Sequence, residues 1–456
     1  MEVKKRGAGN QVDMLNGSLA DKIILFALPL AASSVLQQLF NAADLAVVGR
    51  FASAQAMAAV GSNGAVINLI ISLFVGLSVG ANVVIATLIG TGHKERVNEA
   101  VHTVIAVSLV AGFLLVGVGI VVSRPILRMM GAPADVMNMA ILYLRIYFLA
   151  MPAIMVYNYG SAILRSKGDS RRPLYALTLC GVINVLLNLL LVIVFHLHVI
   201  GVAAATVIAN IFGAGLILYF LTHEEEAFRL DFRRLRIKKE YLVQMMQIGL
   251  PAGLQGAVFS LSNVVIQSAI NSFGADAIAG STAVSNFDFI SYCIINAFAQ
   301  AAVTFTSQNF GAMKTDRCKK VFRTSMACGI GASAVVVVIL VVIRYQFIRI
   351  FTTDPEVIRF AMIRVMNAFV LHFLIGTYEI SGGCLRGMNH SLVPALISVF
   401  GSCLFRLLYV FTFFPAHRSF ANLVRVYPIS WTLTGITMLT AYFIIRRREF
   451  LKYARQ

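Results

Sequence analysis

Long apolar segments recur along the whole chain, and they limit the fold more than any other feature of the sequence. A hydrophobic helix of about 20 residues spans the hydrocarbon core of a bilayer. Only 13% of the 456 residues are charged, whereas about a quarter is usual in soluble domains. The sequence therefore predicts an all-α polytopic membrane protein with twelve transmembrane helices. Their approximate bounds are 23–49, 60–88, 100–122, 135–158, 172–195, 200–221, 242–271, 280–308, 320–343, 356–382, 392–414 and 422–445.

The basic residues are concentrated in alternate loops between the predicted helices and at both termini. These stretches include 4–6, 93–96, 165–172, 229–240, 314–323 and 446–448. Cytoplasmic loops of membrane proteins carry an excess of Lys and Arg. The formal net charge of +18 therefore indicates orientation and not a nucleic-acid partner. We expect a multi-pass protein of the cell membrane with both termini in the cytoplasm. No secretory signal is expected in MEVKKRGAGNQVDMLNG, which lacks a short apolar core and a cleavage site.

The second half of the chain repeats the first. A displacement of 221 residues aligns ILRSKGDSRRP at 163–173 with CLRGMNHSLVP at 384–394, and one of 222 residues places Pro29 on Pro251. Each half holds six predicted helices, so both halves enter the membrane from the same side. Parallel repeats of this kind are known among secondary transporters. The predicted organisation is a six-helix lobe at 1–221, a basic cytoplasmic linker at 222–240 and a second six-helix lobe at 241–456.

The sequence contains no motif for ATP, a metal or a redox cofactor. The phosphate-binding pattern GxxxxGK[ST] and the zinc motif HExxH do not occur. The six cysteines form no CxxC pair, so neither a disulfide framework nor a metal knuckle is predicted. We therefore expect no catalytic residues, no cofactor, no metal centre and no enzyme activity. An ion gradient remains as the energy source for transport.

An acidic residue, Asp44, lies in the first predicted helix, within QQLFNAADLAVVGR at 37–50. Polar residues precede it at intervals of three or four, which places them on one side of the helix. They are Ser34, Gln37, Gln38 and Asn41. Lipid offers no hydrogen-bond partners, so this stripe should face an interior cavity. The alternative is an Asp that reaches toward the headgroups beside Arg50, but its side chain is short. We favour an Asp44 that marks an ion pathway.

A second polar group lies in the same half. Asn184 and Asn188 are one helical turn apart within GVINVLLNLLL, so they share a face. Asn158 ends the fourth predicted helix, and Thr206 lies in the sixth. Amides in membrane helices also serve as hydrogen-bonded contacts between helices, each contributing about 1 kcal/mol or less. From the residues alone, both interpretations stay open.

At this point the chain resembles the MATE (multidrug and toxic compound extrusion) transporters along nearly its whole length. The resemblance rests on LP at 28–29, on D-x-x-x-V-G starting at Asp44, and on the paired loops LRSKGDS and LRGMNHS. It implies that Asp44 couples transport to a cation and that Pro29 is a conformational hinge. It also implies roles in the cation site for Asn158, Asn184, Asn188 and Thr206. Members with two carboxylates carry an aspartate at the position of Asn188, so the coupling ion here stays open between H⁺ and Na⁺ at Asp44.

The second lobe offers further candidates for a substrate cavity. Glu379 lies in the tenth predicted helix, and His372, seven residues earlier, should point to nearly the same side of an α-helix. A neighbouring arginine could instead neutralise Glu379, with Arg364 or Arg406 as the partner. Asp288 in SNFDFISY is a weaker candidate. The complete set expected to line the cavity is Gln38, Asn41, Asn263, Asp288, His372 and Glu379.

Together these patterns predict a monomeric antiporter in a lipid membrane that exports small amphipathic or cationic organic compounds by alternating access. A lipid-linked oligosaccharide flippase of the same superfamily is the alternative within transport, but such proteins carry a strongly basic central cavity. A polytopic membrane enzyme is the alternative from another class. The repeat and the missing catalytic motifs count against it.

Overall fold

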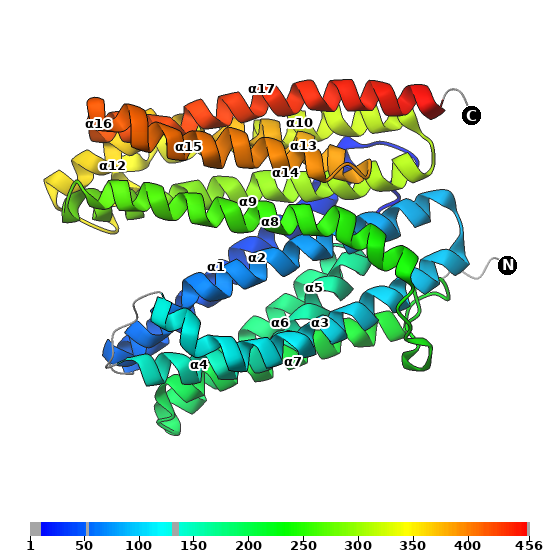
Figure 1. Ribbon diagram of the computed structural model, residues 1–456, viewed down its shortest axis with the longest axis horizontal. Coiled ribbons are helices and arrows are strands. Elements are labelled where there is room, and N and C mark those ends of the chain that lie inside the picture. Colours follow the sequence, from blue (N-terminus) through cyan, green and yellow to red (C-terminus); the bar gives the residue numbers. More distant parts are fainter. Residues whose placement is uncertain (1–10, 52–53, 130–135, 454–456) are drawn as a thin grey trace. The chain divides into compact units, whose positions relative to one another are not determined.

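The computed structural model describes residues 11–51, 54–129 and 136–453, and within them every regular element is helical (Figure 1). Eleven helices in this part of the chain are long and apolar enough to cross a membrane. A further pair, α4 (Met137–Leu149) and α5 (Met151–Ser166), is bent by 45° and counts as a twelfth span when taken together. The predicted all-α fold with twelve spans is confirmed.

The remaining helices of the first half are α1 (Ala20–Phe51), α2 (Ala54–Thr91), α3 (Lys94–Met129), α6 (Arg171–Asn188) with a π-helical continuation η1 (Leu189–Val194), and α7 (His198–Thr222). Those of the second half are α8 (Lys239–Asn271), α9 (Ala275–Gly311), α10 (Thr315–Val342), α11 (Arg344–Arg349), α12 (Pro355–Asn367), α13 (Ile375–Gly387), α14 (Leu392–Ser398), α15 (Phe405–Leu408), α16 (Phe414–Ala416) and α17 (Phe420–Tyr453). Short 3₁₀ segments lie at η2 (Phe232–Arg234) and η3 (Phe369–Leu374), and π-helical segments at η4 (Val399–Leu404) and η5 (Tyr409–Phe413).

The internal repeat is preserved in the turns that follow the helices. Gly168, after α5, has φ 99°, and its counterpart 221 residues later, Asn389, has φ 66°. Both lie in the left-handed region that commonly ends a helix. The hydrogen bonds match as well, since Asp169 N donates to Leu164 O over 3.0 Å and His390 N donates to Leu385 O over 2.9 Å. The two halves therefore share the backbone conformation of this turn as well as its sequence.

The chain forms two compact units whose limits fall inside helices. The N-unit holds Ala32–Gly249 and the residues up to Val12, and the C-unit holds Asp13–Ala31 and Leu250–Gln456. Helix α1 therefore gives its first turns to the C-unit, and α8 gives its first turns to the N-unit. Pro29 in α1 and Pro251 in α8 lie within three residues of these two limits.

The charged segment between α7 and α8 is held against the start of α3, within the N-unit. Asn98 Nδ2 donates to the carbonyl oxygens of Glu226, over 3.0 Å, and of Arg229, over 3.2 Å. His102 Nε2 accepts from the backbone nitrogen of Asp231 over 3.1 Å. The backbone groups of this segment lie outside the helices and need other partners, which side chains of α3 provide. The segment therefore follows a defined path over α3.

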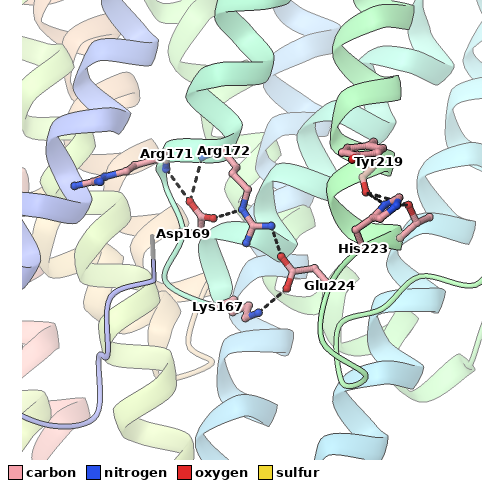
Figure 2. Close-up of polar contacts among 8 residues, drawn as sticks. Lys167, Asp169, Arg171, Arg172, Tyr219, His223 and Glu224 are labelled. Carbon is pink, nitrogen blue, oxygen red and sulfur yellow. Dashed lines mark hydrogen bonds and ion pairs between the residues drawn. The ribbon is translucent and has the colours of Figure 1, made fainter. Parts of the chain in front are cut away.

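Four charged side chains connect the turn after α5 with the end of α7 (Figure 2). Glu224 lies 2.5 Å from Lys167 Nζ and also pairs with Arg172, which in turn pairs with Asp169. Asp169 Oδ1 accepts from the backbone nitrogens of Arg171, over 3.0 Å, and Arg172, over 3.1 Å, and so satisfies free N–H groups at the start of α6. The network thus fixes one end of α6 to one end of α7.

Candidate functional site

The ring of Phe40 on α1 packs against Gly181 on α6, beside Asp44 and its partners. A Cβ atom added at Gly181 on α6 would lie 1.9 Å from the ring of Phe40 on α1. Only glycine leaves room for this ring, because real Cβ atoms do not approach other heavy atoms so closely. Asp44 lies one turn beyond Phe40, and Asn184 lies one turn beyond Gly181. The glycine therefore lets the two polar stretches meet.

Asp44 lies between two amide side chains of α6. Asn188 Nδ2 donates to Asp44 Oδ1 over 2.5 Å. When the amide nitrogen of Asn184 faces Asp44, it donates to Oδ1 over 2.5 Å and to Oδ2 over 3.3 Å. Among the described residues, no Lys, Arg or His forms an ion pair with Asp44. The carboxyl group is thus surrounded by neutral hydrogen-bonding groups.

In its other orientation the Asn184 side chain contacts a different set of groups. Its nitrogen then donates to Thr206 Oγ1 over 3.4 Å, and its oxygen accepts from Asn188 Nδ2 over 3.2 Å. The same oxygen lies 2.5 Å from Asp44 Oδ1. Two acceptor oxygens at this separation repel each other. The orientation in which the amide nitrogen of Asn184 faces Asp44 is therefore the one that satisfies both groups.

One acceptor of the cluster has no hydrogen-bond partner. Asn188 is fully buried, and its Oδ1 accepts no hydrogen bond from any described residue. The cluster thus offers hard oxygen atoms from Asp44, Asn184, Asn188 and Thr206. Such atoms are also the ligands that hard cations prefer, so the residues fit either a bound proton or a small cation.

A buried apolar group lies near the polar cluster along α1 and α7 of the N-unit. Val47 on α1, Tyr143 on α4, and Val199 and Val202 on α7 belong to one buried group, which Val192 in η1 joins. Val47 is less than one turn from Asp44, and Val202 is one turn from Thr206. This packing surrounds the stretches of α1 and α7 that carry Asp44 and Thr206, while the side chains of Asp44 and Thr206 stay partly exposed.

No described hydrogen bond joins Asn158, Gln38 or Asn41 to Asp44. Asn158, on α5, donates to Ile154 O of its own helix over 2.8 Å. No described hydrogen bond joins it to the Asp44 cluster. Gln38 and Asn41 are exposed on α1, and so is Arg50. Within the stripe, Asp44 is therefore partly buried, whereas Gln38 and Asn41 are exposed.

The C-unit contains a second charged group, centred on Asp288 of α9. Arg364 Nη2 on α12 lies 2.5 Å from Asp288 Oδ2, and Arg364 Nη1 donates to Ser281 O over 2.9 Å. His372 Nε2 lies 3.8 Å from Asp288 Oδ1, and its Nδ1 lies 3.0 Å from Ser291 Oγ. Arg364 therefore neutralises Asp288, whereas the sequence had suggested it as a partner of Glu379.

The expected alignment of His372 with Glu379 assumed one continuous α-helix. Residues 369–374 instead form the 3₁₀ segment η3, and α13 starts at Ile375. A 3₁₀ helix has three residues per turn, so the α-helical spacing does not apply. His372 contacts Asp288, Ser291 and the ring of Trp431, whose centroid is 5.3 Å away.

Glu379 is partly buried on α13. The nearest arginine in sequence, Arg386, is two turns further along α13 and donates to Gln255 Oε1 over 2.8 Å. Arg406, the other suggested partner, donates to Ser430 Oγ over 2.9 Å. Within the described residues no ion pair involves Glu379. Asn263 is exposed on α8.

Sequence reasoning missed Gly181 as a determinant of the site and Gln255 as a partner of Arg386. The first has a signal in the sequence, because a glycine one turn before a polar pair in a membrane helix favours close helix approach. The second depends on contacts between distant segments of the chain, which no local pattern predicts.

Comparisons with known proteins agree with this architecture. The MatE family model matches residues 29–190 and 251–412, once for each repeat. A relative in Bacillus subtilis, named "Probable multidrug resistance protein YoeA", is 30% identical over 82% of this chain and 83% of its own length. The "Probable multidrug resistance protein NorM" of Thermotoga maritima is 25% identical, over 83% of this chain and 82% of its own. A solved structure described as an outward-facing multidrug resistance MATE family transporter of the MOP superfamily aligns with a TM-score of 0.87 at 21% identity, covering 98% of this chain and 99% of that one.

Proposed function

The chain belongs to the MatE family of membrane transporters, and we propose that it is a cation-coupled antiporter that exports small organic compounds. The relatives named above carry the name of probable multidrug resistance proteins, which supports drug-like small organic compounds as substrates and does not favour a lipid-linked oligosaccharide flippase. We propose that these compounds are amphipathic or cationic. The observation that carries the proposal is the contact of Asp44 with Asn184 and Asn188. Asp44 is titratable, and the amide groups of Asn184 and Asn188 that donate to it respond to a change in its charge.

We favour a proton as the coupling ion. When Asp44 is ionised, the amide nitrogens of Asn184 and Asn188 both donate to it. A proton taken up by Asp44 would remove the charge to which these two amides donate, and so would weaken the contact between α1 and α6. Proton binding would then act differently on helix arrangements that keep this contact and on those that lack it, which coupling requires.

Sodium is the second candidate for the coupling ion. The unpartnered oxygen of Asn188 and the oxygens of Asp44, Asn184 and Thr206 could bind Na⁺. Only one of these four groups carries a negative charge, so the ion's charge would be balanced by a single carboxylate. A proton needs no further ligand, and this difference is our reason for placing it first.

For the conformational change we propose Pro29 and Pro251 as hinges. Proline removes a backbone hydrogen bond within a helix and favours a kink there. Both prolines lie next to the points where α1 and α8 pass from one compact unit to the other. A bend at these points would let each unit move as a rigid body while the helices stay continuous. This supports alternating access with lobes close to the predicted 1–221 and 241–456.

The exposed amides of Gln38, Asn41 and Asn263 are our candidates for contacts with the substrate. We also include Glu379 and the group formed by Asp288 and His372. The basic loops support a cell-membrane protein with both termini in the cytoplasm. We further propose that the protein acts as a monomer.

The test is accumulation of a fluorescent cationic dye inside everted vesicles, into which an exporter moves its substrate, energised separately by a pH gradient and by a Na⁺ gradient. Asp44→Asn keeps the size of the side chain and removes its charge and its titration, so we expect the variant to insert normally and to lose coupled efflux. Glu356→Gln is the matched control, because its carboxylate is 57% exposed and pairs with Arg359 on the surface. Normal gradient-driven efflux by Asp44→Asn, at equal abundance in the membrane, would remove Asp44 from the mechanism.

A further inference from the structure

Two neighbouring cavities lie at the start of α10 in the C-unit. Their volumes are about 510 Å³ and 440 Å³, and both are lined by Gly17, Arg317 and Lys320. Lys314 lines the first and Arg323 the second. The walls come from α10 and from the segment that precedes α1. Four cationic side chains thus line two adjacent cavities that are open to the surface.

Arg317 builds the wall of these cavities. Its Nε donates to Met14 O over 3.1 Å, its Nη1 to Gly17 O over 2.8 Å and its Nη2 to Asn16 O over 2.9 Å. Lys314 Nζ donates to Leu15 O over 2.9 Å. These bonds go to neutral carbonyl groups, so they hold the segment in place and leave the positive charge of both side chains uncompensated.

The other two cations are free to bind a ligand. Lys320 and Arg323 are exposed, and no described residue forms a hydrogen bond or an ion pair with either of them. The first cavity is also lined by Asp316, whose carboxylate is paired with Lys319 over 2.9 Å. No acidic residue lines the second cavity. The second cavity therefore has three cations and no anion of its own.

The surroundings favour an anion attached to an apolar chain. Beyond Arg323, the exposed side of α10 continues through Ala327, Gly331, Val335 and Val338, at the spacing of one helix face. This stripe is apolar and would face lipid. A Cβ added at Gly331 would meet nothing within 4 Å, so the stripe is open at that point.

We propose that the second cavity binds a phosphate group at the membrane interface, namely that of an anionic phospholipid whose acyl chain lies along the apolar stripe of α10. Basic pockets near the cytoplasmic ends of transmembrane helices attract such headgroups, and each Lys or Arg contributes about fivefold in affinity. Arginine and lysine both donate to phosphate oxygens. This inference does not depend on the identity of the coupling ion or the exported compound.

The test measures lipid binding to the purified full-length protein in a non-ionic detergent by native mass spectrometry. Phosphatidylglycerol, phosphatidylcholine and inorganic phosphate are the three probes. The variant is Lys320→Gln with Arg323→Gln. The matched control is Arg447→Gln with Arg448→Gln, two exposed arginines at the end of α17. The charge-preserving variant Lys320→Arg with Arg323→Lys tests whether charge, and not shape, is recognised.

We expect phosphatidylglycerol to bind the unaltered protein more tightly than phosphatidylcholine does. Loss of both charges should weaken phosphatidylglycerol binding about thirtyfold, whereas the control and the charge-preserving variant should change it less than about threefold. Equal binding of phosphatidylglycerol by the unaltered protein and the Lys320→Gln, Arg323→Gln variant would overturn the proposal. Displacement of the lipid by millimolar inorganic phosphate, with the same loss in the variant, would show that a soluble anion is the ligand and would refute the lipid.

Discussion

Replacement of Glu224 by Gln tests whether the buried ion pairs of Figure 2 hold α6 and α7 together at one end. The side chains of Glu224 and Lys167 are 4% and 6% exposed, and their charged atoms are 2.5 Å apart. Gln has the shape of Glu without the charge, so the variant leaves the Lys167 ammonium buried without its counter-ion. Arg172 keeps a second carboxylate, that of Asp169.

The expected cost follows from this burial. Removal of one partner of a buried ion pair costs about 3–5 kcal/mol, because the remaining charge is uncompensated. Since only Lys167 loses its sole carboxylate, we expect the lower end of the range, about 3 kcal/mol of unfolding free energy. Lys167→Met combined with Glu224→Gln removes both charges and should recover most of that loss. An exposed pair is worth about 1 kcal/mol or less, so the control Glu356→Gln should change stability little.

The assay is equilibrium unfolding of the purified protein in mixed micelles of a non-ionic detergent and sodium dodecyl sulfate, followed by circular dichroism. Glu224→Gln, Lys167→Met and the double variant form a double-mutant cycle. The cycle isolates the interaction between Lys167 and Glu224. If Glu224→Gln costs less than about 1 kcal/mol, the pair behaves like an exposed one and our reasoning from its burial is refuted.

The same pair predicts how stability depends on pH. Burial alone would raise the pKa of Glu224, but the hydrogen bond and charge of Lys167 and the charge of Arg172 bring that pKa below its ordinary value of 4.5. A carboxyl group with a lowered pKa in the folded state contributes its full stabilisation above the ordinary pKa and loses it as the pH falls through the folded value. The unaltered protein should therefore lose unfolding free energy as the pH falls below about 5. Glu224→Gln should lack this component.

Three further variants probe the two charged sites. Asn188→Asp adds a second carboxylate that can share a proton with the first, so proton-driven efflux should persist with a higher pH optimum; a lower Na⁺ requirement at fixed pH would instead identify Na⁺ as the coupling ion. Gly181→Ala should reduce efflux, because the added methyl group displaces the ring of Phe40, and adding Phe40→Ala should restore part of the loss. Unchanged transport by Gly181→Ala in the vesicle assay would contradict the idea that the contact between Gly181 and Phe40 determines the site. Asp288→Asn leaves Arg364 buried without a carboxylate and should cost about 3 kcal/mol in the unfolding assay, and an unchanged stability would show that the pair is not energetically coupled.

Patterns that depend on neighbours along the chain could be predicted from the sequence. The twelve spans follow from hydropathy, because a bilayer requires each crossing segment to be apolar and to satisfy its own backbone. The repeat follows from matching turns, and the structure confirms it at Gly168 and Asn389. The prediction that Asp44 is functional follows from its position alone, since ionisable residues within apolar membrane helices usually pair with another polar group or lie on an ion pathway. Its pairing with Asn188 was an expectation from family resemblance, and the hydrogen bond between them is consistent with it.

The tertiary structure decided which polar groups meet, because that depends on helix phase, close approach and local departures from α-geometry. Arg364 pairs with Asp288, although the sequence had suggested it as a partner of Glu379. The 3₁₀ segment at 369–374 changed the direction of His372 relative to α13, which a spacing argument based on 3.6 residues per turn could not anticipate. Asn158 turns back to its own helix. A side chain's partner is set by the distance between atoms on different helices, and sequence spacing describes only the angle around one helix axis.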